Sequence, residues 1–338
     1  MEQPSVAVVV PAYNAAQLLP RMLPAAIESA GGGVVLVVDP GSTDATSSVA
    51  EGLGAQVVRL PHRAGPARAR NIGVAHVEAD VVLFLDADCV PALDVVERVR
   101  GAFASEPELV SLTGSYDDSP PDPGFFSQYM NLRHHYTHHR AQRSPATFWA
   151  GCGAVRREAF LSVGGFDARR FPRPQIEDIE LGYRLREAGQ TRLDPELQVT
   201  HLKRWTLSST VYTDIVERGV PWTELMLEQD DVPDDLNLRL SQRVAAALAP
   251  FALLAAPGLV VAAFAGDGGV ALACLLVLAG AVALQRDFVG ELVRLRGPGF
   301  AARAWLFHQV HLSYSGVVFC LCWARHRLRD PRRAGGSL

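Results

Sequence analysis

The chain of 338 residues is longer than one typical domain, and 49% of its residues are hydrophobic, which is more than in an average soluble enzyme. Its 32 basic and 36 acidic side chains leave a formal net charge of −4, so the chain has no general basic surface and nucleic acid is not an expected partner. The five cysteines have neither a zinc-like spacing nor the pattern of a disulfide framework, which favours reduced thiols in a cytoplasmic setting.

Short apolar strands alternate with stretches of helical spacing over the first hundred residues. We expect strands over 6–10, 34–38, 55–60 and 81–85, with helices over 18–29, 43–53, 67–77 and 92–104. Alternation of this kind predicts an α/β fold with a doubly wound, Rossmann-like and mainly parallel sheet. In such folds ligands bind at the carboxyl ends of the strands.

Polar residues follow each of the four expected strands. The segments are Pro11-Ala12-Tyr13-Asn14, Asp39-Pro40-Gly41-Ser42-Thr43-Asp44, Ala69-Arg70-Asn71-Ile72-Gly73 and Asp86-Ala87-Asp88. A structural role is available for several of these residues, since Asn14 and Ser42 suit helix caps. Local roles of this kind do not explain why all four polar segments converge on one edge of the sheet.

The pair Asp86 and Asp88 ends the apolar run 81–85. Two carboxylates one residue apart suit a hard cation such as Mg²⁺ or Mn²⁺, which can hold a diphosphate while the first acid faces a ribose or sugar hydroxyl. The alternative is a solvated turn before a helix, with Pro91 in the first helical turn.

Together the four segments resemble the nucleotide-sugar half of the family 2 inverting glycosyltransferases, which have the GT-A fold. The resemblance implies a set of nucleotide-sugar contacts: Pro11, Ala12, Tyr13 and Asp39 around the base, usually uracil, Arg70 near the phosphates, Asp86 at the ribose and Asp88 at the metal. The family often has two consecutive acids where this chain has Asp39-Pro40, which leaves the identity of the base open. No Gly-x-Gly-x-x-Gly or Walker loop is present, and this disfavours a dehydrogenase or a P-loop enzyme.

Two further segments resemble the donor-sugar and acceptor half of the same family. Gly151, Cys152 and Gly153 match the family's donor-sugar and acceptor wall, although ordinary turn glycines are the alternative. The run from Glu177 resembles the family's Glu-Asp-x-x-Leu-x-x-Arg helix opening, and the helix dipole also favours acids there. In the family the aspartate of this pair takes the acceptor's proton, which indicates Asp178 as the base. Glu177 would shape its environment or bind sugar hydroxyls.

His201 follows a strand-like segment and could complete the metal shell of Asp88, because imidazole is an acceptable ligand for Mn²⁺. By spacing, His201-x-x-Arg204-Trp205 also resembles the Gln-x-x-Arg-Trp motif of processive polysaccharide synthases, and the replacement of Gln by His indicates a non-processive relative. Arg204 is a candidate partner for the diphosphate leaving group. A surface histidine beside an interfacial tryptophan is the alternative.

Two uncharged apolar stretches, 244–266 and 268–285, are each long enough to cross a hydrocarbon core of about 30 Å and are separated by Asp267 alone. They predict a transmembrane hairpin, and arginines flank both of its ends, which places these ends and the catalytic domain in the cytoplasm. The stretch 304–324 is also uncharged. We expect a third span there, with re-entrant packing as the alternative, since the arginines that follow it oppose a third crossing.

We therefore expect a GT-A domain over 1–235 and, over 236–338, a region with two to three transmembrane helices and a basic C-terminal tail in the inner membrane. The resemblance implies a Mg²⁺- or Mn²⁺-dependent single displacement that moves a sugar from a nucleotide sugar, with UDP as the expected nucleotide. The acceptor would be membrane-associated, such as a polyprenyl phosphate or a glycolipid. Alternatives are a processive polysaccharide synthase, a GT-A-like nucleotidyltransferase and a non-catalytic membrane scaffold.

Overall fold

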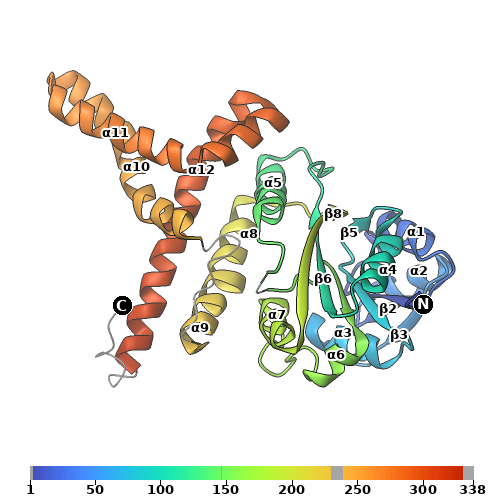
Figure 1. Cartoon of the computed structure of the whole chain (residues 1–338). Helices are drawn as coiled ribbons and strands as arrows, with labels where there is room; N and C mark the ends of the chain where they lie inside the picture. Colours follow the sequence, from blue (N-terminus) through green and yellow to red (C-terminus); the bar gives the residue numbers. More distant parts are fainter. Residues whose placement is uncertain (1–2, 146, 230–238, 330–338) are drawn as a thin grey trace. The chain divides into compact units, whose positions relative to one another are not determined.

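The computed structural model describes residues 3–145, 147–229 and 239–329 (Figure 1). The chain divides into two compact units, Met1–Thr206 and Leu207–Leu338. The first unit is α/β and the second is helical. The helices between 207 and 229 belong to the second unit because they contact its last helix.

The described part of the first unit contains eight strands and seven helices. In chain order they are β1 (Val6–Pro11), α1 (Leu19–Ala30), β2 (Val35–Asp39), α2 (Thr46–Gly52), β3 (Gln56–Arg59), α3 (Pro66–Ala75), β4 (Val81–Leu85), β5 (Cys89–Pro91), α4 (Val95–Ser105), β6 (Leu109–Tyr116), α5 (Phe125–Arg140), β7 (Cys152–Arg156), α6 (Arg157–Ser162), α7 (Glu177–Ala188) and β8 (Gln190–His201).

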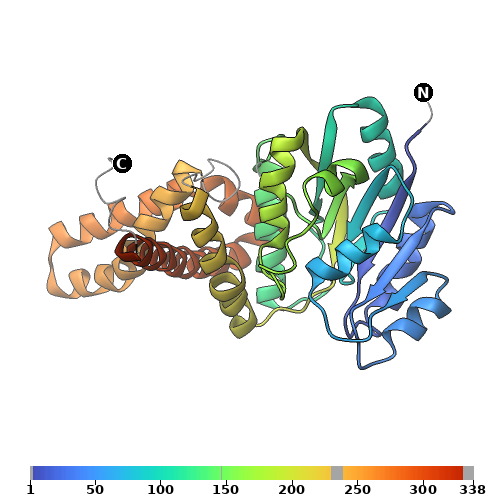
Figure 2. The same ribbon diagram turned by 90° about the horizontal axis from the view of Figure 1, so that it is seen from below.

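The strands form one sheet in the order β3-β2-β1-β4-β7-β6-β8-β5. The first four are parallel, as predicted, and helices lie along both sides of the sheet (Figure 2). Consecutive residues of β1 therefore pack into two different cores, with Val8 in one and Val9 in the other, because side chains alternate across a strand. The second half of the sheet is mixed, since β7 runs antiparallel to both β4 and β6.

A short strand, β5, follows the Asp86-Ala87-Asp88 turn. The alternative in which Pro91 opens a helix is wrong, because Pro91 ends β5 and helix α4 begins only at Val95. Strand β5 lies at the edge of the sheet, where a proline without an N–H is tolerated. It runs antiparallel to β8 with Cys89 opposite His201, so the acidic turn and the end of β8 are neighbours.

The second unit consists of helices. They are α8 (Leu207–Tyr212), the π-helix η1 (Thr213–Gly219), α9 (Val220–Gln229), α10 (Leu240–Ala265), α11 (Gly268–Leu284) and α12 (Arg286–Arg329). The two stretches predicted as a transmembrane hairpin form helices α10 and α11, which contact each other, and the side chain of Asp267 caps α11 by accepting hydrogen bonds from the backbone N–H groups of Gly269 and Val270, both at 3.0 Å. Helix α12 is kinked at Gly297, whose φ is 81°.

Within the described residues, α10 is the one helix that is by itself long and apolar enough to cross a membrane. Helices α11 and α12 meet that condition only together, as a pair bent by 71°. The stretch 304–324, predicted as a third span, is helical but does not qualify alone. His308, Gln309 and His311 lower its hydropathy, and the first two are buried within the helical unit.

Candidate active site

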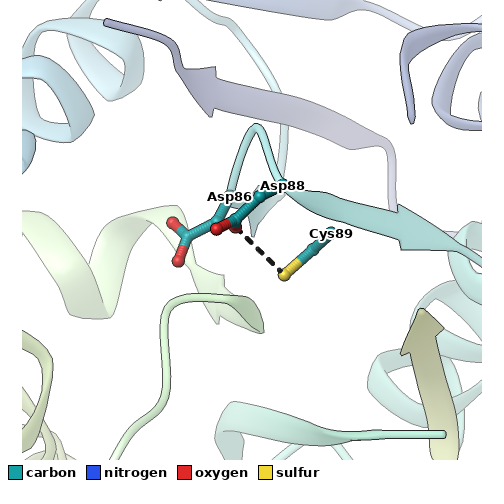
Figure 3. A group of neighbouring side chains, drawn as sticks. All are labelled: Asp86, Asp88 and Cys89. Carbon is teal, nitrogen blue, oxygen red and sulfur yellow. Dashed lines mark hydrogen bonds between the residues drawn. The ribbon is translucent and has the colours of Figure 1, made fainter. Parts of the chain in front are cut away.

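The acidic turn places two carboxylates and a thiol together at the end of β4. One oxygen of Asp86, one oxygen of Asp88 and Sγ of Cys89 all lie within 4.8 Å of one another. Figure 3 shows the two carboxylates beside each other, with the thiol donating to Oδ1 of Asp88 over 3.7 Å. Burial and the neighbouring carboxylates raise the pKa of the Cys89 thiol, so this thiol keeps its proton at neutral pH.

His201 lies next to this cluster because β5 pairs with the last residues of β8. Its Nε2 is 3.5 Å from Oδ2 of Asp88, and the imidazole is only 6% exposed. Neighbouring ligands of an octahedral Mg²⁺ or Mn²⁺ lie about 3 Å apart, given metal–oxygen bonds of about 2.1 Å, so the pair fits one divalent cation. Burial raises the pKa of Asp88, but the hydrogen bond and charge of His201 outweigh burial and hold that pKa below its usual value. Asp88 is therefore ionised at neutral pH.

Arg70 of α3 connects the acidic turn to α7. Its Nη2 is 2.6 Å from Oδ1 of Asp86, and its Nη1 is 3.0 Å from Oε1 of Glu177. Burial alone lowers the pKa of the guanidinium, but the charges of Asp86 and Glu177 raise it well above its usual range. The resemblance placed Arg70 near the donor phosphates. In the structure Arg70 is 4% exposed and its two terminal nitrogens contact carboxylates.

Asp178 lies in the first turn of α7, beside Glu177. Its Oδ2 accepts a hydrogen bond from the backbone N–H of Ala150 at 3.2 Å, and its Oδ1 accepts one from the N–H of Ile179 at 2.9 Å. Burial, followed by the charge of Glu177, raises the pKa of Asp178 to about 7, against the opposing charge of Arg70. A carboxylate with this pKa can accept a proton near neutral pH, which is the property of a general base.

The residues expected around the nucleotide base lie at the ends of β1 and β2. Asp39 is fully buried, and its carboxylate accepts hydrogen bonds from the N–H of Ser42, at 2.7 Å, and from the hydroxyl of Ser47. Ala12 is also fully buried, and Pro11 is half-buried. Tyr13 is 37% exposed, and the guanidinium of Arg63 lies over its ring at 4.8 Å. Asp39 therefore orders the loop, and Tyr13 presents an aromatic surface.

The glycines of the expected donor-sugar wall are required by packing. A Cβ on Gly151 would lie 2.4 Å from the ring of Trp149, and one on Gly153 would lie 2.4 Å from the carbonyl oxygen of Trp149. The carbonyl of Gly151 also accepts a hydrogen bond from the N–H of Asp86 at 3.3 Å. Cys152 between them is a buried free thiol. This segment therefore connects the acidic turn with Ala150, which holds Asp178.

Arg204 and Trp205 differ in exposure. The side chain of Arg204 is 83% exposed, with its Nε 3.5 Å from a carboxylate oxygen of Asp122. Trp205 is 6% exposed, its backbone N–H donates to the hydroxyl of Ser127 at 2.8 Å, and Nζ of Lys203 lies 4.0 Å from its ring centroid. The alternative of a surface histidine with an interfacial tryptophan is wrong, because both His201 and Trp205 are buried in the first unit.

Asp86, Asp88, Glu177, Asp178 and His201 thus come together from three elements. Sequence reasoning missed Arg63 and Tyr116, and it placed Trp149 and Ala150 in the donor-sugar and acceptor wall without indicating that they contact Tyr116 and Asp178. Ala150 contributes a backbone N–H, which no sequence pattern shows. Arg63 is a lone arginine in a loop, and its spacing gave no signal.

Comparisons with known proteins show the family and the fold of the chain. The model of the family described as glycosyl transferase family 2 matches residues 7–164. An uncharacterized glycosyltransferase of Mycobacterium bovis is 31% identical over 211 residues, which cover 57% of this chain and 92% of the relative.

A pre-mycofactocin glycosyltransferase of Mycobacterium tuberculosis is 30% identical over 224 residues, which cover 61% of this chain and 46% of the relative. The chain therefore spans about half the length of that relative. The solved structure of a mannosyltransferase from Pyrobaculum calidifontis, in complex with GDP-Man and Mn²⁺, shares the fold with a TM-score of 0.60 at 20% identity, covering 95% of this chain and 88% of the other.

Proposed function

The chain belongs to glycosyl transferase family 2, and we propose that it moves a sugar from a nucleotide sugar to a membrane-associated acceptor by a single displacement that inverts the anomeric carbon. The observation that carries this proposal is the position of Asp178. This carboxylate, with its pKa raised to about 7, lies in one charged network with the acidic turn, joined to it by Arg70 and Glu177. A base close to a cation-binding pair is what an inverting transfer requires.

Asp88 and His201 would hold the divalent cation, with Asp86 beside them at the donor. When bound, such an ion neutralises charge that develops on the diphosphate leaving group. The Mn²⁺ in the mannosyltransferase complex makes Mn²⁺ the first ion to test, with Mg²⁺ as the second. Arg204, which is exposed, is the cationic side chain that can move to the leaving group.

Asp178 would take the proton of the acceptor as the new glycosidic bond forms. A phosphate acceptor is already ionised at neutral pH and needs little help from a base, whereas a hydroxyl must lose its proton during the transfer. The raised pKa of Asp178 therefore favours a hydroxyl acceptor, such as that of a glycolipid, over a polyprenyl phosphate.

Tyr13 and the wall at Gly151, Cys152 and Gly153 would contact the donor. We propose that the base stacks near the ring of Tyr13, with Arg63 on that ring, while buried Asp39 keeps the loop in shape. UDP is the nucleotide expected from the resemblance, and the GDP-Man of the mannosyltransferase makes a guanine nucleotide the alternative.

The bilayer is the proposed partner of α10 and α11. Large apolar side chains of these helices are exposed, with Leu254 at 70%, Phe264 at 90% and Leu276 at 63%. Neither helix carries a charge between 244 and 284 apart from the capping Asp267, so a lipid phase covers this surface without burying an unpaired charge. We propose that this hairpin crosses the inner membrane with the catalytic unit in the cytoplasm.

The test is an incubation of membranes that contain the protein with a panel of radiolabelled nucleotide sugars and Mn²⁺. Label should move from one donor into the organic phase, EDTA should stop the transfer, and the nucleoside diphosphate should be released. Asp178→Asn should slow the transfer about 10²- to 10⁴-fold, while Glu187→Gln on the exposed face of the same helix should leave it unchanged. Release of pyrophosphate would identify a nucleotidyltransferase instead, long polymers would identify a processive synthase, and no transfer from any donor would contradict the proposal.

A further inference from the structure

Tyr116, the last residue of β6, lies directly on the proposed metal ligand His201. The two rings are stacked with their centroids 4.3 Å apart and their planes 15° from parallel. Both side chains are 6% exposed, so the stack is held inside the unit. At the edge of the same imidazole, Nε2 lies 3.5 Å from Oδ2 of Asp88.

The pairing of β6 with β8 places Tyr116 in this position. Tyr116 is in register with Val199 after an irregularity between Thr113 and Ser115, where a Cβ on Gly114 would lie 2.3 Å from the carbonyl oxygen of Leu197. The carbonyl of Tyr116 also accepts a hydrogen bond from Nδ1 of His135 at 2.8 Å. The backbone of Tyr116 is therefore held by β8 and by His135 of α5.

The same ring also contacts the segment that holds the base. Trp149 meets Tyr116 edge to face, with ring centroids 4.7 Å apart and planes at 76°. The next residue, Ala150, donates to Asp178, and Gly151 accepts from the N–H of Asp86. One side chain thus touches both the cation side and the base side of the site.

We infer that Tyr116 is a positioning residue that fixes the plane of the His201 imidazole for the divalent cation. This inference rests on the proposed function, in which Asp88 and His201 hold that cation. An imidazole binds a metal along the lone pair in its own plane, so rotation about its Cβ–Cγ bond would turn Nε2 away from the ion. A parallel aromatic ring at contact distance blocks that rotation.

If the planar face of Tyr116 orients the imidazole, three substitutions should differ in their effect on the binding of Mn²⁺. Tyr116→Phe keeps the face and should keep the affinity for Mn²⁺. Tyr116→Met refills the volume with a flexible chain that has no planar face, so it tests orientation with little loss of packing. Val110→Ala removes buried volume from the same strand on the opposite face of the sheet, and serves as the control for lost stability.

The experiment is a titration of the full chain in detergent with Mn²⁺ alone, followed by the paramagnetic signal of the free ion. Loss of a side chain that orients a ligand typically weakens metal binding about 10- to 100-fold, and we expect this for Tyr116→Met and for His201→Ala. Tyr116→Phe and Val110→Ala should bind Mn²⁺ like the wild type, the latter with a lower melting temperature.

Other outcomes separate the inference from the proposed function. Wild-type affinity in Tyr116→Met, with weak binding in His201→Ala, overturns the role of Tyr116 and leaves the metal ligands in place. Wild-type affinity in His201→Ala overturns both. Equal weakening in Tyr116→Phe and Tyr116→Met assigns the effect to the hydroxyl and refutes the stacking argument, as does equal weakening in Val110→Ala.

Discussion

Removing the charge of Asp178 should stabilise the folded protein while it strongly slows the transfer. Burial and the charge of Glu177 raise the pKa of Asp178 from its usual 3.8 to about 7. At about 1.4 kcal/mol per pKa unit, the ionised carboxylate costs the folded state up to about 4 kcal/mol. Asp178→Asn keeps the shape of the side chain and removes this cost, and the loss of one of the two hydrogen bonds accepted from Ala150 and Ile179 offsets about 1 kcal/mol of the gain.

The sign of the pH dependence follows from which state binds the proton. Between pH 3.8 and about 7 the folded state keeps a proton on Asp178 that the unfolded state releases, so the free energy of unfolding falls as pH rises through this window. The contribution is present below pH 3.8 and fully lost above about 7. The free energy of unfolding of the wild type should therefore fall by up to about 4 kcal/mol across this pH range, whereas that of Asp178→Asn should not show this fall.

The assay is denaturant unfolding of the full chain in detergent with EDTA at several values between pH 4 and 8, paired with transfer rates in Mn²⁺. Asp178→Asn should be more stable than the wild type at pH 8 and nearly equal at pH 4, with Glu187→Gln following the wild type throughout. The rate of the wild type should rise through about pH 7, and that of Asp178→Asn should be about 10²- to 10⁴-fold lower and flat. A variant less stable than the wild type at pH 8, or a wild-type rate independent of pH, would refute this reasoning.

Three further predictions follow from other parts of the site. Arg70→Met leaves the carboxylates of Asp86 and Glu177 without their buried partner and should lower the free energy of unfolding by about 3–5 kcal/mol, measured by denaturant unfolding. EDTA should abolish transfer and added Mn²⁺ should restore it in the wild type, whereas Asp88→Asn should need more Mn²⁺; transfer that persists in EDTA would contradict the cation site. Gly182→Ala places a Cβ 2.1 Å from a backbone nitrogen and should cost about 1–3 kcal/mol of stability. Gly101→Ala, at an exposed position of α4 with open space around it, should gain up to about 1 kcal/mol, and equal effects of the two substitutions in thermal unfolding would contradict the packing.

The parallel half of the sheet was predictable because each strand is a short run buried on both faces. The run 81–85 is fully buried, and its apolar composition alone indicates this. Strand β5 was not predictable, because three residues that end in Pro91 have no strand pattern of their own and become a strand only by pairing with β8. The directions of β6, β7 and β8 depend on the same kind of distant pairing.

For the site, the sequence indicated the residue types but not their connections. Asp88 and His201 were expected to share a cation, and the structure places them 3.5 Å apart. The ion pairs of Arg70 with two carboxylates could not be predicted from the sequence, because a motif match does not indicate which charged groups a guanidinium contacts. Tyr116 was missed for a related reason, since its stack depends on an irregular register between β6 and β8.

The ladder between β5 and β8 has a consequence for how the enzyme matures. Asp88 belongs to an early part of the polypeptide and His201 to a late one, and the pairing of β5 with β8 makes them neighbours. A nascent chain that has been synthesised as far as α4 already contains Asp86 and Asp88. The proposed cation site is incomplete until β8, which ends in His201, is synthesised and pairs with β5. Binding of Mn²⁺ would then indicate that the first unit is complete, and it would favour the docking of β8 between β6 and β5.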